Sequence, residues 1–210
     1  MAFTNVSKPS GLSPVRYLNG AMYNGKVNQY CILAADTNAY WPGDLVTPVA
    51  NGDSNGIPAV SLAAAGGVAI GVVVAVGLIP QGGPYINPNN LAVIGRPAAA
   101  QSQIWYVAVS DDPNIIYSIQ EGGAGANLTQ TSCNRNANIL YAAPATGVSV
   151  SGTTLNNASV TTTSTLNLKI MRLIQAPDNH FVTNPSTGGG GQKWEVLINN
   201  HYLRGGVTSL

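Results

Sequence analysis

Two strongly apolar runs on either side of a turn-forming segment constrain the fold of this chain more than any other feature. The first run, at 104–109, reads IWYVAV, and the second, at 115–119, reads IIYSI. β-branched and aromatic residues favour strands, and the intervening SDDPN segment is dense in residues that turn a chain. The stretch Gln103–Gly123 is therefore predicted to be a hairpin of two core strands that ends at a Gly-Gly pair.

The adjacent acids Asp111 and Asp112 admit two interpretations. Paired carboxylates could bind a metal or perform acid/base chemistry. In a turn, however, an Asp side chain accepts hydrogen bonds from nearby backbone N–H groups, and Pro113 fixes φ. We favour the turn interpretation, because both residues stand directly before a proline between two strands.

The shortage of charge limits both the fold class and the function. The chain has nine basic and eight acidic residues among 210, with a formal net charge of +1. Nucleic-acid binding needs a basic surface, and disorder usually accompanies high charge and few apolar residues, so both are disfavoured. Because Glu, Lys and Arg are rare, strands should outnumber helices. A chain with so little charge also tends to associate, which suits a subunit of an assembly.

These features predict an all-β fold, an antiparallel β-barrel or sandwich with long loops rich in Gly, Pro and Asn. Residues 1–14 are polar, contain Pro9, Gly11 and Pro14, and are predicted to form an extended arm. Residues 15–210 form the β domain. This domain is either one unit or two lobes, 15–80 and 101–210, joined by a Pro/Gly-rich connection at 81–100.

The uncharged segment 57–79 is long enough to cross a bilayer as a helix. It contains Pro58 and a Gly-Gly pair, it is rich in Val and Ile, and no Lys or Arg flanks it. We therefore predict two strands, Ala59–Ala63 and Val68–Val76, joined by a Gly-Gly turn, and no membrane span.

The C-terminal half predicts further strands. Residues 146–165 are rich in Thr and alternate weakly, which predicts a pair of strands with small side chains. In the strand that follows, Leu166, Leu168 and Ile170 alternate with Asn167, Lys169 and Met171, and the last strand is Lys193–Asn199. Between these two strands, the segment 183–192 (TNPSTGGGGQ) is predicted to be a flexible tip.

Few residues could support catalysis. The only histidines are His180 and His201, no Gly-x-Ser-x-Gly motif accompanies them, and Asp178 near His180 is typical of a polar loop. Asp44 follows Pro-Gly and is interpreted as a turn residue. Cys31 and Cys133 are predicted to be free thiols, too far from each other and from the histidines in sequence to suggest zinc. We therefore predict no catalytic residues, no cofactor and no metal site, and a protein that is not an enzyme.

The order of five segments resembles a known family. SGLSPVRYLNGAMYNGK is followed by AYWPGDLVTPV, GIPAVSLAAAGGVAIGVVVAVG, WYVAVSDDPNIIYSIQEGG and finally WEVLINNHYL. This series resembles the head decoration or cement proteins of tailed bacteriophages, small virion proteins encoded beside the major capsid protein. The GDLV segment with the following AIGVVVAVG strand is similar to the β-barrel of several such families, whereas residues 147–165 match least well.

The resemblance implies a structural role. Such a protein would be made in the cytoplasm of the bacterial host, bind the outside of the assembled capsid, and cement neighbouring capsomers against the pressure of internal DNA. Its partners would be the major capsid protein and copies of itself, as a dimer or trimer, with no nucleic acid and no membrane. The expected contact elements are the 1–14 arm, the Thr-rich hairpin and the glycine tip, because arms and exposed strand edges can pair with a neighbour.

The alternative function is host recognition, by a phage fibre or baseplate domain or a carbohydrate-binding β domain. Trp41, Trp105 and Trp194 would then stack on sugar rings. Their positions within apolar runs favour core packing instead.

Overall fold

The computed structural model describes residues 5–77, 95–181 and 191–204. The described chain is nearly all β, as predicted, and its two helical elements are single 3-10 turns. In chain order the elements are β1 (Ser13–Tyr17), β2 (Asn28–Ile32), β3 (Leu45–Gly52), β4 (Pro58–Leu62), β5 (Gly71–Val76), β6 (Trp105–Ser110), β7 (Ile115–Gly122), η1 (Gln130–Ser132), β8 (Asn136–Ala137), β9 (Ile139–Leu140), β10 (Thr154–Asn156), η2 (Asn157–Ser159), β11 (Leu168–Leu173) and β12 (Lys193–Ile198).

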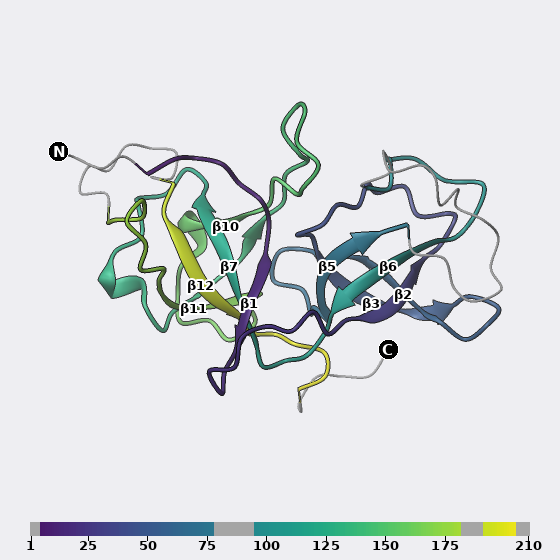
Figure 1. Ribbon diagram of the computed structural model, residues 1–210, viewed down its shortest axis with the longest axis horizontal. Coiled ribbons are helices and arrows are strands. Elements are labelled where there is room, and N and C mark those ends of the chain that lie inside the picture. Colours follow the sequence, from purple (N-terminus) through teal and green to yellow (C-terminus); the bar gives the residue numbers. More distant parts are fainter. Residues whose placement is uncertain (1–4, 78–94, 182–190, 205–210) are drawn as a thin grey trace.

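The strands form two lobes that lie side by side (Figure 1). One lobe is a closed barrel with the strand order β2-β4-β3-β5-β6. The other is a sheet with the order β8-β11-β12-β7-β10-β9, in which β1 also pairs with β7. Most pairings are antiparallel, and the two parallel ones are β2 with β4 and β7 with β10.

Strands β6 and β7 are where the sequence predicts them, but the prediction that they pair as a hairpin is wrong. β6 pairs with β2 and β5 in the barrel, whereas β7 pairs with β1, β12 and β10 in the sheet. The turn at 110–114 therefore carries the chain from one lobe to the other. Strand propensity and turn residues gave the local structure correctly, but the partner of each strand is chosen by long-range packing.

The same distinction applies to β4 and β5. Both strands exist, close to the predicted ranges, and Gly66 in the connection has a φ of +75°. They are not neighbours, however, because β3 lies between them and pairs with both. No helix in the described ranges is long and apolar enough to cross a membrane.

Consecutive apolar residues occur in the barrel strands β3 and β5 where both faces of the strand are buried. On β3, Leu45 packs into the core shared with the sheet lobe, and its neighbour Val46 packs inside the barrel. On β5, Val72 and Val73 divide in the same way. Adjacent residues of a strand point to opposite faces, so a strand enclosed between two cores is apolar at every position.

In the C-terminal half, the predicted strand at 166–171 is confirmed in substance by β11. Leu168, Ile170 and Leu173 of this strand are buried, and a register shift between Ile170 and Arg172 brings Leu173 back to the core face. The prediction of a Thr-rich hairpin at 146–165 is wrong. Only the short β10 forms there, pairing with β7 and β9, while 160–165 is irregular and largely exposed.

The side chain of Asn167 fastens the two lobes together. Its Oδ1 accepts a hydrogen bond from Gly66 N at 2.9 Å, and its Nδ2 donates to Ala64 O at 3.0 Å and to Gly67 O at 2.8 Å. Asn167 belongs to the sheet lobe, lies just before β11 and is fully buried, whereas the turn at 64–67 belongs to the barrel. One amide therefore satisfies three backbone groups of the other lobe.

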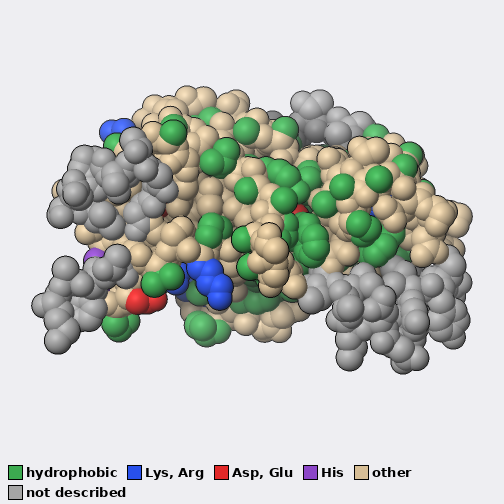
Figure 2. Space-filling model, turned by 90° about the horizontal axis from the view of Figure 1, so that it is seen from above, with side chains coloured by type: hydrophobic (Ala, Val, Ile, Leu, Met, Phe, Trp, Pro, Cys, Tyr) green, Lys and Arg blue, Asp and Glu red, His purple; other side chains and the backbone are tan. Residues whose placement is uncertain are grey.

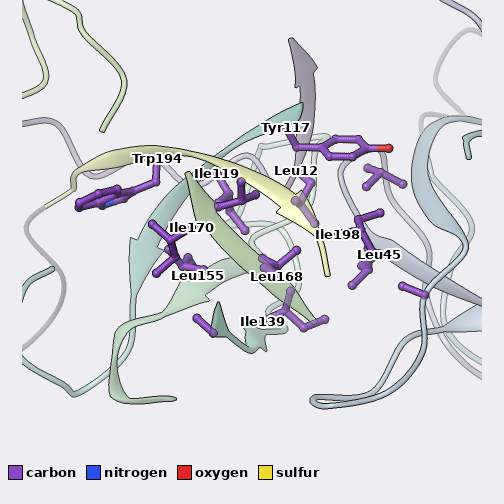
Figure 3. Close-up of a cluster of buried hydrophobic side chains, with 14 of the residues drawn as sticks. Leu12, Leu45, Tyr117, Ile119, Ile139, Leu155, Leu168, Ile170, Trp194 and Ile198 are labelled. Atoms are coloured by element: carbon purple, nitrogen blue, oxygen red, sulfur yellow. The ribbon is translucent and has the colours of Figure 1, made fainter. Parts of the chain in front are cut away.

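Backbone contacts and a common core join the lobes at further points. Leu12 N donates to Gly43 O at 2.9 Å, and Ala69 N donates to Asn200 O at 2.9 Å. The largest apolar cluster mixes residues of both lobes, and in Figure 3 Leu45 of the barrel faces Leu168 and Ile198 of the sheet.

The pairing of strands groups the chain differently from the two sequence ranges considered above. β6 lies beyond the 81–100 connection yet completes the barrel, and β1 lies near the start of the chain yet joins the sheet. Each lobe therefore contains chain from both sides of 81–100. Of the 1–14 arm, residues 5–14 are described. Ser13 and Pro14 belong to β1, and residues 5–12 contact the same chain, since Lys8 N donates to Gln120 Oε1 at 2.8 Å.

Replacing Asn167 with Ala should destabilise the whole molecule. The change leaves backbone groups of the 64–67 turn without their partners, which should lower the free energy of unfolding by about 2–3 kcal/mol. Urea unfolding followed by tryptophan fluorescence and by circular dichroism should give one coincident transition in both proteins. Asn114→Ala, at an exposed position, is the matched control. Separate melting of the two lobes would contradict the fastening role.

Candidate functional site

The two acids singled out by the sequence have different structural roles. Asp112 holds the turn as predicted, because its Oδ1 accepts a hydrogen bond from Asn114 N at 2.8 Å. Asp111 reaches back to β2 instead, where Asn28 Nδ2 lies 2.9 Å from both carboxylate oxygens and Tyr30 Oη donates at 2.7 Å. Asp111 is buried, and burial together with this hydrogen bond raises the pKa of Tyr30. The pair therefore fixes the passage between lobes.

Asp44 is more than a turn residue. Its carboxylate is fully buried beside the boundary of the lobes, where Trp41 N donates to Oδ2 at 2.8 Å and Thr153 Oγ1 donates to Oδ1 at 3.5 Å. Burial raises the pKa of Asp44 to about 6, although hydrogen bonds from Ser151, Trp41 and Thr153 oppose the shift. The sequence signal that could have indicated this role is slight, since Thr153 is 109 residues away.

His180 and His201 lie in different environments. His180 is exposed, and its ring Nε2 lies 2.7 Å from Pro177 O. His201 is buried, its Nδ1 accepts a hydrogen bond from Leu203 N at 3.1 Å, and burial lowers its pKa to about 4. No group of three or more His, Cys, Asp or Glu side chains that could hold a metal occurs among residues 5–77, 95–181 and 191–204.

The indole rings proposed for sugar stacking are not available as exposed platforms. Trp194 is fully buried and Trp105 is 9% exposed. Trp41 is partly buried, and its ring lies so close to Gly95 that a Cβ at that position would approach Trp41 Cε3 to 2.3 Å. All three rings therefore have packing roles.

Much of the small complement of charge is inside the molecule. Arg96, to which the sequence assigned no role, is fully buried and donates to Asp36 O and Asn38 O, holding the loop before β3. Glu195 accepts hydrogen bonds from the guanidinium groups of Arg16 and Arg172 across the sheet. Four of the eight acids are buried: Asp44, Asp111, Glu121 and Glu195. The surface is correspondingly more neutral than the composition alone suggests.

The most distinctive surface feature is a projecting loop, residues 141–150, that rises above the junction of the lobes (Figure 1). It reads YAAPATGVSV, and no charged residue occurs anywhere from 136 to 168. Six of the ten residues from 141 to 150 are exposed, including the three alanines and Tyr141. The sequence placed contact residues in this region as a Thr-rich hairpin, but the loop itself presents Ala, Pro and Val.

The projecting loop is held firmly at its base. Gly152 N donates to Ala142 O at 3.0 Å, and Ser151 N donates to Pro42 O of the barrel at 2.9 Å. A Cβ on Gly152 would lie 2.4 Å from Ala143 O, so only glycine allows the two legs to approach this closely. At the far end, Val148 N donates to Ala145 O at 2.9 Å and closes a turn. The loop therefore has a defined shape without a core of its own.

A groove of about 160 Å³ lies at the foot of the projecting loop, between the lobes. Its lining contains no charged residue and includes Leu12, Pro14, Pro42, Val73, Val74 and Val150. Seen from above, hydrophobic side chains gather over the middle of this face, and most of the visible charged side chains lie toward the left (Figure 2). We call the projecting loop and this groove together the upper surface.

A second apolar area, the turn patch, surrounds the 112–114 turn on the opposite side of the molecule (Figure 1). It consists of Leu18, Met22 and Leu203, which are 44%, 73% and 54% exposed. Leu18 N donates to Asn114 O at 2.9 Å, and the Arg204 guanidinium donates to Pro113 O at 2.5 Å, so both flanking segments rest on the turn. This patch was not predicted from the sequence, because its three residues do not form an apolar run.

The other predicted contact elements are only partly visible. The 5–12 part of the arm lies on its own sheet lobe. Of the glycine tip at 183–192, only Gly191 and Gln192 lie within the described residues, and Gln192 is buried with its Nε2 donating to Glu121 Oε1 at 3.2 Å.

Replacing Asp44 with Asn should change how stability depends on pH. A carboxyl group whose pKa is raised from 3.8 to about 6 by folding stabilises the native state fully below pH 3.8, and this contribution is lost as the pH rises through 6. The stability of Asp44→Asn relative to the unmodified protein should therefore rise by about 2 kcal/mol between pH 4 and pH 7. Urea unfolding at several pH values measures this difference.

Taking the difference between the two proteins removes the contribution of His201, which has the opposite sign because its pKa is lowered from 6.5 to about 4. Asp178→Asn, at an exposed carboxyl, controls for the change in net charge. A relative stability for Asp44→Asn that stays constant across this pH range would contradict the buried-carboxylate assignment.

Comparison of the chain with protein-family models, with characterised proteins and with solved structures finds no match.

Proposed function

We propose that this protein is a structural virion component that binds the outside of a tailed-phage capsid and cements neighbouring capsomers. The observation that carries the proposal is the presence of two apolar surfaces on opposite sides of one fastened body. The upper surface and the turn patch are separated by the junction that Asn167 holds. A protein that bridges neighbours needs two contact surfaces and a stiff body between them.

A stiff body with two contact surfaces is suited to stabilising a capsid. A small protein at each junction adds buried area, on the order of 1,600 Å² for a standard interface, and the symmetry of the shell repeats the gain. Because the protein binds the assembled shell and not its separated parts, binding stabilises the shell by linkage. A preformed surface loses little conformational entropy on docking, so more of the contact energy appears as affinity.

The neutral composition supports the same function. An expanded head is covered by a repeated surface, and a cement protein present in many copies must lie close to others of its kind. Buried acids and paired arginines leave few exposed charges to repel such neighbours. The alternative of carbohydrate recognition loses its candidate residues, because Trp41, Trp105 and Trp194 are packed against their own chain.

Purified protein should bind expanded heads of the phage that encodes it and raise their melting temperature. Met22→Asp, which places a charge at the most exposed residue of the turn patch, should weaken binding by about tenfold or more, because the charge would lose water on docking. Sedimentation of heads with bound protein measures the affinity, and calorimetry measures the melting temperature.

Ser54→Asp provides a matched control, since Ser54 is exposed and lies outside both apolar surfaces and outside the expected contact elements. It should bind heads like the unmodified protein. If the unmodified protein neither associates with heads nor occurs in purified virions, the proposed function is wrong. Equal loss of binding in both variants would exclude the turn patch as a contact surface.

A further inference from the structure

We propose that the upper surface is a two-fold interface between copies of this chain, in which the projecting loop of each copy enters the groove of the other. This deepens the proposed function and takes its biological meaning from it, but it concerns the free protein. The argument rests on the chemistry of the loop, on the size of the groove and on their adjacency.

The projecting loop has the properties of a segment that a partner protein covers. Ala142, Ala143 and Ala145 are exposed on a projection whose shape is fixed by the hydrogen bonds at its base and tip. An exposed apolar patch with a fixed shape is typical of an interaction site in a soluble protein. Fixing the loop in advance also reduces the entropy lost when a partner binds it.

The groove has the size and chemistry to receive the tip of such a loop. Its volume is about 160 Å³, and a cavity of about 150 Å³ accommodates a benzene-sized group. The pyrrolidine ring of Pro144, or two alanine side chains, is of this size. The lining includes Leu12, Pro42 and Val74 and has no charged residue, so it matches an uncharged tip.

Because the projecting loop and the groove are adjacent, we infer that the loop of a second copy of this chain occupies the groove. Val150 belongs to the returning leg of the loop and also lines the groove, and Ser151 N is bonded to Pro42 O at the groove margin. In a two-fold interface the same patch is used by both partners, so a projection beside a recess is self-complementary. A two-fold axis that lies between two facing upper surfaces, and parallel to them, would bring each tip to the partner's surface beside the base of the partner's loop, where the groove lies.

The lack of charged residues in the projecting loop and in the groove lining disfavours charged partners. A nucleic acid would require Lys or Arg to neutralise phosphates, and the entire segment from 136 to 168 has none. A charged peptide would need opposite charges on this surface, and the groove lining has none. A neutral apolar surface is complementary to another neutral apolar surface, and the same chain supplies one.

The first test is the oligomeric state of the protein in solution, measured by light scattering and by sedimentation velocity over a range of concentrations. We expect a dimer that Ala145→Asp weakens by about tenfold or more, because the charge would enter an apolar groove. Ala21→Asp is the matched control, an exposed alanine on the opposite hairpin, and should leave the dimer unchanged. A monomeric unmodified protein, or a dimer equally stable in both variants, would overturn the proposal.

The second test identifies the contact without relying on a destabilising charge. Pro144→Cys and Ser10→Cys variants, both carrying Cys133→Ser, are mixed and oxidised, since Ser10 lines the groove. We expect a disulfide-linked dimer of one variant with the other, and none when Ala21→Cys replaces Pro144→Cys. Absence of the mixed dimer while the protein remains dimeric would place the interface elsewhere and overturn the proposal.

These measurements use no capsids, so the two proposals fail separately. A dimer with the expected cross-link that does not bind heads would overturn the cement function alone. A protein that binds heads but shows neither dimer nor cross-link would overturn the loop-in-groove interface alone.

Discussion

The way the two lobes meet depends on the tight turn between β6 and β7, one of the places where the chain passes from one lobe to the other. β6 is paired on both sides in the barrel and β7 is paired on both sides in the sheet, so the angle of this turn sets how the lobes meet. Tyr117 fixes that angle, because its Oη donates to Ser110 O at 2.9 Å and lies 3.2 Å from Ser110 Oγ. Asp111 binds the turn to β2 through Asn28 and Tyr30. Without these bonds the turn would be free to flex, and the contacts of Asn167 and the shared core would have to hold the lobes together alone.

The polar groups at the junction of the lobes include two of the few charged side chains of this chain. Asp44 and Asp111 are buried beside the junction, where hydroxyl, amide and backbone donors satisfy their oxygens. Neutral donors lessen the cost of burying a carboxylate without an ion pair. Asn167 achieves a similar result with no charge at all. Such groups add little net energy, but they penalise any other arrangement of the lobes, because a shifted junction would leave them buried and unpaired.

The local structure of this chain could be predicted from its sequence, but the strand with which each strand pairs could not. The apolar runs at β6 and β7 indicated strands because Ile, Val, Trp and Tyr favour extended backbone, and Pro113 with Asp112 indicated a turn. Nothing in those residues states that β6 joins β2 and β5 while β7 joins β12. The sequences of β4 and β5 suggested a hairpin for the same reason, although β3 separates them. Strand pairing depends on which faces of each strand are buried. Leu45 and Val72 are buried in the core that the two lobes share, and this core forms only when both lobes are in place.

The projecting loop was not predicted from the sequence for a different reason. Thr-rich alternation between 146 and 165 suggested strands, but strand propensity there is weak and small side chains cannot supply a core of their own. The chain instead forms one short strand, β10, on the edge of β7 and leaves 141–150 projecting. The signal that could have revealed this is the combination of Gly152, Pro144 and Gly147 around a run of alanines, which is typical of a narrow loop. A projection without charge cannot easily be explained as a solvated loop, since such loops are usually polar. Its fixed base beside an equally uncharged groove is the observation on which the proposal of a partner that covers both is based.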